Sequence, residues 1–303
     1  MQEQKSKWVK FGAIFAILIM VGSAVLVGLL LTDSGSNKTT EFLLSDTPGT
    51  QANFTFKNAI DGSKYLPEGV LGITIRTIYS NDTVDQGLKQ DFPGIEADKL
   101  MTASYSAGRI DYFSLRNESN ASVTINGKPQ YDVYEGHNIL FLGPSHRLVA
   151  GNPLILVTFL NYADNSLAKR AVDVLSGKSL GSTDLSDILS YADDVAVFYE
   201  ITVFKANDGS NYSKYYQRSS EFIDMTTLEL AFQIESIVLQ PNAEMKADIY
   251  ALSENAAGSN KITIVEEGNA LKAYIDSSDV TEFIQDRDAL YEIVSVHTRQ
   301  SAA

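Results

Sequence analysis

The chain has 303 residues, no cysteine, and 38 acidic residues against 24 lysines and arginines. The missing cysteine excludes thiolate metal sites, iron–sulfur clusters and cysteine nucleophiles. The formal charge of -14 disfavours nucleic acid and anionic lipid surfaces as partners, because both are polyanions.

Residues 11–31 form one uncharged apolar run. A helix of that length spans the roughly 30 Å hydrocarbon core of a bilayer. Three lysines precede the run and Asp33 follows it, which predicts residues 1–10 as a cytoplasmic tail and the C-terminal domain as extracytoplasmic. A cleaved secretory signal is one alternative, but the run is longer than a usual signal core and lacks a small-x-small site at its end. A type IV pilin-like leader is another, disfavoured because Phe11 separates Lys10 from Gly12. We therefore expect an uncut, single-pass anchor in the plasma membrane.

Small residues gather on one side of this predicted transmembrane helix, within about 160° of arc. Such a face lets two helices approach closely in lipid, where packing drives association. The pattern predicts contact with another transmembrane helix, in a homo-oligomer or in a larger complex, and a passive anchor is the alternative. The residues of this face are Gly12, Ala13, Ala16, Ser23, Ala24 and Gly28.

The glycosylation pattern Asn-x-Ser/Thr occurs six times, always after the predicted membrane span. Glycosylation without disulfides favours an archaeal-like cell surface, with a bacterial cell envelope as the alternative. The six acceptors are Asn37, Asn53, Asn81, Asn117, Asn120 and Asn211.

The segment after the span reads first as a linker and then as a strand-rich lobe. Residues 32–62 are rich in Ser, Thr, Asn and Gly, which is typical of a stalk. Residues 63–150 predict a β-meander or small sandwich with one weak helix near 84–92. Its expected strands are 69–79, 109–115, 122–125, 131–134 and 139–142.

Residues 151–303 predict an α/β lobe, a sheet with packed helices. The apolar run 154–160 indicates a strand buried on both faces, and the periodicity of 167–175 and 185–192 indicates two helices. Strands are expected at 195–204, 228–235, 245–251 and 291–297, with a hairpin across 267–269 and a short helix capped near Asp279. The fold class is thus one transmembrane helix followed by a strand-rich α+β ectodomain, built as one lobed domain or two.

Two apparent motifs fail on inspection. Ser176-Gly177-Lys178-Ser179 resembles the end of a phosphate-binding loop, but Val172 occupies the position of the first required glycine. A helix C-cap is the better interpretation. The stretch 207–211 is rich in oxygen ligands but lacks the distal Glu of a calcium loop, which favours a glycosylated hairpin tip.

The three histidines, His137, His146 and His297, are not spaced as a zinc pair. Ser145 precedes His146, but we expect neighbouring side chains to point apart, and no Gly-x-Ser-x-Gly elbow surrounds them. The sequence therefore predicts no catalytic residue, no cofactor site and no metal site. A carboxylate pair among the many external acids stays open.

Three function classes fit these observations. The first is a membrane-anchored, N-glycosylated structural or interaction protein of the cell surface, without evident catalysis. The second is an accessory single-span subunit of a larger membrane complex. The third is an extracytoplasmic hydrolase that uses carboxylates, which would need a deep pocket holding two acids with different pKa values.

The small face of the anchor can be tested directly. Replacing Ala16 and Ala24 with Leu should disrupt self-association or partner association in a membrane assay, because bulky side chains keep the helices apart. An unchanged association signal would contradict the prediction.

Overall fold

A computed structural model describes residues 39–43, 56, 59–80, 82–92, 94–116, 122–126, 130–151, 153–159, 165–192, 200–205, 214–223 and 230–300. The fold is mixed α+β with antiparallel strand pairing. The chain divides into two compact units, each described by itself. Unit 1 comprises Met1–Phe54, Ile78–Asp98 and Phe113–Ala168, and unit 2 comprises Thr55–Thr77, Lys99–Tyr112 and Lys169–Ala303.

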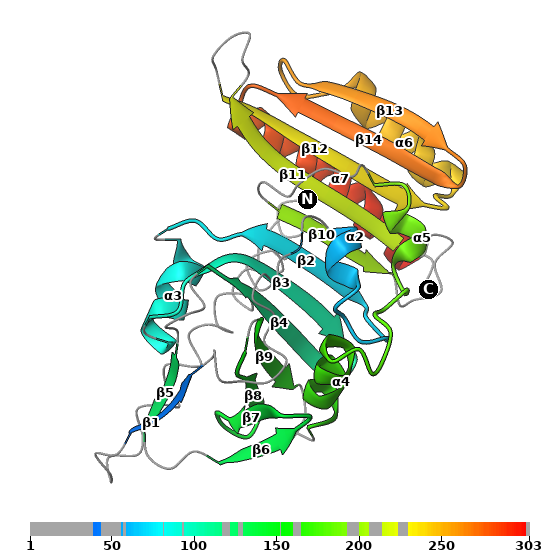
Figure 1. Ribbon diagram of the computed structural model, residues 1–303. Helices are drawn as coiled ribbons and strands as arrows, with labels where there is room; N and C mark the ends of the chain where they lie inside the picture. Colours follow the sequence, from blue (N-terminus) through cyan, green and yellow to red (C-terminus); the bar gives the residue numbers. More distant parts are fainter. Residues whose placement is uncertain are drawn as a thin grey trace. The chain divides into compact units, whose positions relative to one another are not determined.

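Unit 2 contains a sheet with the strand order β13-β14-β12-β11-β10-β2-β3-β4 (Figure 1). The strand β13 lies at one end of this order and forms a hairpin with β14. The bounds are β2 (Gly72–Thr77), β3 (Ala97–Tyr105), β4 (Gly108–Leu115), β10 (Glu200–Lys205), β11 (Lys214–Ile223), β12 (Leu230–Leu239), β13 (Lys261–Glu267) and β14 (Ala270–Ser277).

Two helices, α6 (Ala243–Glu254) and α7 (Val280–Gln300), pack on one face of the strands β12, β13 and β14 (Figure 1). The helix α6 starts where Asn242 accepts a hydrogen bond from the backbone N–H of Met245, at 2.7 Å. Burial of apolar side chains between these helices and the strands stabilises this part of unit 2. The shared core contains Tyr215, Ile234, Val238, Met245, Ile249, Leu271, Ala273, Ile275, Phe283, Leu290 and Val294.

The opposite face of the same sheet is covered by two short helices. A Cβ on Gly62 of α2 (Ala59–Ser63) would lie 2.8 Å from Met101 Sδ and 3.0 Å from Ile75 Cδ1, so this helix packs directly on β2 and β3. The helix α5 (Ser186–Leu189) contacts α2, β11 and β12, and its Ile188 is fully buried. The strand β12 is continuously buried from residue 234 to residue 239, and therefore on both of its faces.

Unit 1 contains four antiparallel strands in the order β9-β8-β7-β6 and a separate two-stranded sheet of β1 and β5. Its strands β8 and β9 are almost entirely buried. The bounds are β1 (Thr39–Leu43), β5 (Ser122–Asn126), β6 (Tyr131–Tyr134), β7 (His137–Phe141), β8 (His146–Val149) and β9 (Leu154–Phe159), with the helices α3 (Thr83–Asp91) and α4 (Ser166–Leu175). Residues of β3, β4 and α4 belong to both units.

Two expected strands are helices. Residues 245–251 belong to α6, in which Met245 and Ile249 are buried, one helical turn apart. Residues 291–297 belong to α7, where the short helix expected near Asp279 continues for 21 residues. In both segments the buried residues recur every three or four positions, so the apparent alternation was misleading.

The end of the helix expected at 167–175 lies where the sequence places it. The helix α4 ends at Leu175, and Gly177 follows with φ +73°, the left-handed conformation of a C-cap. The backbone N–H of Lys178 reaches the Asp173 carbonyl at 2.8 Å, which completes the cap. This confirms the C-cap interpretation of Ser176 to Ser179.

None of the helices in the described ranges is long and apolar enough to cross a bilayer. Residues 11–31 lie outside those ranges, so the membrane anchor stays a prediction, as do the proposed boundaries at residues 10, 31, 62 and 150.

Gly181 gives a test of the fold of unit 2. A Cβ at this position would lie 2.1 Å from the backbone carbonyl oxygen of Lys64, which cannot move like a side chain. We expect Gly181→Ala to lower the free energy of unfolding by about 3 kcal/mol. The adjacent Leu180, 89% exposed, is the matched control, and Leu180→Ala should change stability by less than about 0.5 kcal/mol. Equal urea midpoints for the two variants would contradict this packing.

Candidate functional site

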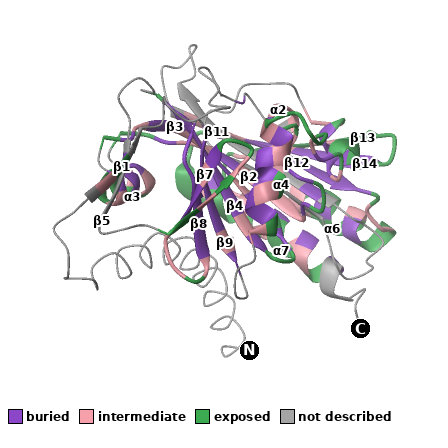
Figure 2. Ribbon diagram, turned by 60° about the horizontal axis from the view of Figure 1, so that its bottom comes forward, coloured by how far each residue is buried: buried purple, intermediate pink, exposed green. Residues whose placement is uncertain are grey.

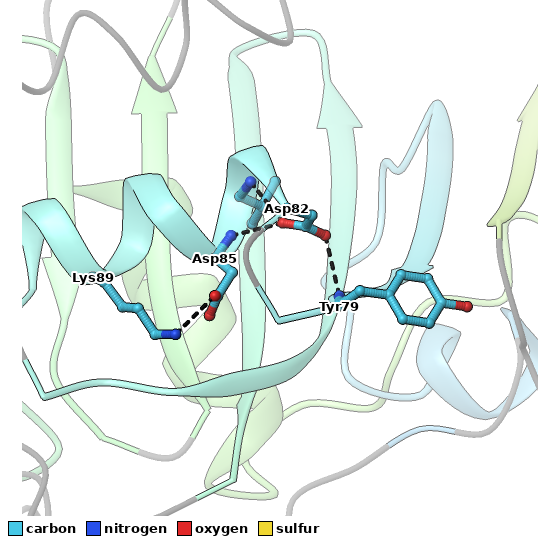
Figure 3. A network of polar contacts seen from close by, with 5 residues as sticks. Tyr79, Asp82, Asp85 and Lys89 are labelled. Carbon is cyan, nitrogen blue, oxygen red and sulfur yellow. Dashed lines mark hydrogen bonds and ion pairs between the residues drawn. The ribbon is translucent and has the colours of Figure 1, made fainter.

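The helix α3 begins at a side chain that holds three backbone N–H groups. Asp82 Oδ1 accepts hydrogen bonds from Val84 and Asp85, both at 2.8 Å, and Oδ2 accepts one from Tyr79 at 3.1 Å (Figure 3). An N-cap of this kind satisfies donors that the first helical turn leaves open. It also fixes the position of Asp85 at the start of the helix.

Asp85 is the buried member of an ion pair beside a small cavity in unit 1. Its carboxylate lies 2.8 Å from the ammonium of Lys89, one turn further along α3 (Figure 3). The cavity has a volume of about 60 Å³ and is lined by Ser80, Asp85, Lys89, Glu96, Ala97 and Arg116.

This cavity combines two carboxylates with two cations. Such a lining suits water or a single small polar group, and the volume is far below the several hundred Å³ typical of small-molecule sites. Asp85 and Lys89 lie four positions apart on an expected helix, so their ion pair could have been predicted from the sequence. The approach of Glu96 and Arg116 could not, because it depends on long-range pairing.

Asp111 is a buried carboxylate in unit 2. Its Oδ2 lies 2.8 Å from Arg109 Nη2, and its Oδ1 accepts a hydrogen bond from Thr102 Oγ1 at 2.6 Å. Burial raises the pKa of Asp111, and the Arg109 charge and the Thr102 hydrogen bond oppose that shift. A single carboxylate held by its own cation is not the pair of acids that glycoside hydrolysis needs.

Ser145 and His146 correct an expectation. Ser145 Oγ lies 3.0 Å from His146 Nδ1, so these neighbouring side chains are joined by a hydrogen bond and do not point apart. The reason is local, because Ser145 lies in the bend before β8, where the alternation of an extended strand does not apply. The contact stabilises the turn, and no serine elbow accompanies it in the sequence.

The next residue, Arg147, is a packed cation. It is 7% exposed, and its guanidinium carbon lies 4.2 Å from the centre of the Phe141 ring. Arg147 Nε donates to Asn165 Oδ1 and Nη1 donates to the Gly143 carbonyl, both at 2.8 Å. Burial lowers the pKa of Arg147. These contacts tie the β7–β8 turn to the segment that enters α4.

The other two histidines are structural. His137 is buried, and burial lowers its pKa, which the Glu135 charge partly opposes. His297 Nε2 lies 2.8 Å from Asp248 Oδ2 and joins α7 to α6. Within the part of the chain that the structure describes, no three His, Asp or Glu side chains gather in a way that could hold a metal ion.

The strand β13 is the most exposed of the unit 2 strands whose burial the structure describes throughout. Five of its seven residues are exposed, and Val265 is 41% exposed. Figure 2 draws exposed residues in green and labels β13. It pairs with β14 on one side, and among the described residues no strand pairs with its other side. Such an edge presents a row of backbone N–H and C=O groups to any chain that can pair with it.

Side chains hold this edge strand firmly on its own domain. On the face of α6, Lys246 Nζ lies 2.6 Å from Glu266 Oε2, and Tyr250 donates to Glu266 Oε1 at 3.1 Å. Hydrogen bonds from Lys246 and then Tyr250 lower the pKa of Glu266. On the other face, the buried Lys272 lies 2.7 Å from Glu267. The edge is therefore preorganised as well as exposed.

The predicted glycosylation and membrane sites cannot be compared with this geometry. All six sequon asparagines and all six residues of the small helix face lie outside the described residues, and so does the stretch 207–211. These sites stay predictions.

Comparison with known proteins gives no relative, since no family model, curated protein or solved structure matches this chain.

The buried His137 predicts a pH dependence of stability. Its pKa is lowered from 6.5 in the folded state, so below about pH 6.5 the unfolded chain binds more protons and the free energy of unfolding falls as the pH drops. In His137→Phe this contribution is lost. We expect the wild type to lose more stability than the variant between about pH 7.5 and 5. Parallel urea-unfolding profiles over that range would contradict the assignment.

Proposed function

We propose that this chain is a single-pass, N-glycosylated protein of the plasma membrane whose extracytoplasmic domain binds another protein through the open edge of β13. The observation that carries the proposal is the exposed, regular edge of this seven-residue strand. Partner recognition by strand addition uses such an edge, because main-chain hydrogen bonds give affinity and alternate side chains give specificity. The predicted anchor, sequons and acidic surface support an interaction at the cell surface.

The composition of β13 supports an interface. Natural proteins shield edge strands with prolines, bulges, charged side chains or very short strands. In β13 the charges lie at the ends, at Lys261, Glu266 and Glu267, whereas Ile262–Val265 is uncharged. A regular, uncharged centre favours pairing with an extended segment of a partner.

The second candidate is an accessory subunit of a larger membrane complex. The small face that includes Gly12, Ala16, Ala24 and Gly28 in the predicted anchor favours it. The two functions differ in which part of the chain binds, since a subunit recruited by its anchor would not need β13. A carboxylate hydrolase is the weakest candidate, because the cavity that brings Asp85 and Glu96 together is too small for a sugar ring.

The proposal is tested by placing a charge in the centre of the edge. Val265→Lys should weaken association of the full-length protein, gently extracted from its own membranes, by about tenfold, because lysine blocks strand pairing. Leu180→Lys, at a position 89% exposed outside the edge, is the matched control and should retain binding. The readout is native mass together with quantitative mass spectrometry of co-migrating proteins.

A stoichiometric assembly in the wild type and the control that disappears in Val265→Lys supports the proposal. Assemblies that persist in Val265→Lys but disappear in the Ala16→Leu and Ala24→Leu variant would favour the accessory subunit instead. A wild-type chain that co-migrates with nothing, including itself, would overturn both.

A further inference from the structure

The charged side chains of β13 are arranged so that the strand complements itself. Two copies of β13 can pair antiparallel with Ile264 of one copy opposite Ile264 of the partner subunit. Lys261 of one copy then lies opposite Glu267 of the partner subunit. Thr263 then lies opposite Val265 of the partner subunit, and both relations occur twice by symmetry. Opposite charges and β-branched residues in directly opposed positions each stabilise antiparallel pairs.

The four residues in these relations share one exposed face. Lys261, Thr263, Val265 and Glu267 are exposed, whereas Ile262 and Ile264 pack against the core beneath α6 and α7. A second strand would therefore add alternate side chains to this open face.

The local charge permits the approach of two acidic chains. Although the whole chain carries -14, the β13–β14 hairpin carries two lysines, Lys261 and Lys272, beside three carboxylates, Glu266, Glu267 and Asp276. Lys246 of α6 pairs with Glu266 at 2.6 Å. The Glu267 side chain is 56% exposed beside Lys272, so its carboxylate is accessible to a second lysine. Pairing at this edge therefore adds no cluster of like charges.

Other registers lose this complementarity. A shift of two residues in either direction removes both Lys261–Glu267 relations. A shift of one residue pairs Lys261 with Glu266 of the partner subunit only if the second copy is turned over, because the two residues lie on opposite faces of β13. Glu266 is also already bound by Lys246 and Tyr250, at 2.6 and 3.1 Å. The register centred on Ile264 is thus the one that satisfies both ends.

We infer that the partner at this edge is a second copy of the chain, bound antiparallel through β13 about Ile264. Two sheets of unit 2 then form one continuous sheet with two-fold symmetry, the isologous arrangement usual for homodimers. This inference rests on the proposed function, because it names the partner for the same edge.

Because the chain has no cysteine, introduced cysteines are its only thiols and can be used in a cross-linking test. Full-length Thr263→Cys and Val265→Cys carry different tags, are co-expressed, and are oxidised in their own membranes. Directly opposed residues in antiparallel strands have Cα atoms about 4.5 to 5.5 Å apart, within disulfide range. The mixed pair should therefore cross-link at least about fivefold more than either variant with itself.

The self-linked species are the register controls. A dominant Thr263→Cys or Val265→Cys homodimer reports a shift of two residues and would overturn the register about Ile264. A wild type of monomeric native mass with no cross-link would overturn self-pairing. Loss of a different stoichiometric partner in Val265→Lys would then still support the proposed function, so the two failures can be told apart.

A charge exchange gives a second measurement that does not depend on oxidation. Lys261→Glu should weaken self-association by about tenfold, because it opposes two carboxylates at each end of the pair. The double variant with Glu267→Lys should restore association, since the opposite charges then face each other again. Failure of the double variant to recover, with its thermal unfolding unchanged, would contradict the proposed contact.

Discussion

The packing of α6 and α7 against β12, β13 and β14 is the constraint on which the rest of unit 2 depends. Their shared core holds the last two strands in place, because Ile249 of α6, Leu290 of α7 and Ile275 of β14 are all buried together. An isolated two-stranded hairpin is marginal in water. The β13–β14 hairpin is a firm edge because β14 is bonded to β12 and because α6 covers one face of β13.

Sequence patterns within a few residues correctly predicted the elements that depend on interactions between near neighbours in the chain. The helix α4, its glycine cap and the hairpin across residues 267–269 follow from side-chain periodicity and turn chemistry. The errors fall where periodicity is ambiguous. In the segment from Met245 to Ala251 small and large apolar residues alternate, but only Met245 and Ile249 are buried, and Asn242 supplies a helix cap. The helix cap at Asn242 was thus a stronger signal for a helix than the alternation was for a strand.

The candidate site could be predicted only in part. The charge pattern of Lys261, Glu266 and Glu267 is visible in the sequence, but the exposure of β13 depends on strand order, which sequence neighbours do not determine. β14 lies between β12 and β13, although β13 is nearer to β12 along the chain. The contact of Ser145 with His146 was missed for a related reason, because a bend sets neighbouring side chains on one side.

The strand order also has a consequence for the order of assembly. β13 is made after β12 but has no bonding partner within unit 2 until residues 270–277 follow it, so during synthesis it passes through an interval with both edges open. The hairpin shortens that interval, because closing a loop of two residues is a local and fast step. Gly268, with φ +56°, makes the tight turn possible. In a newly made chain, the turn at Gly268 thus decides whether β13 meets its own β14 before it meets another molecule.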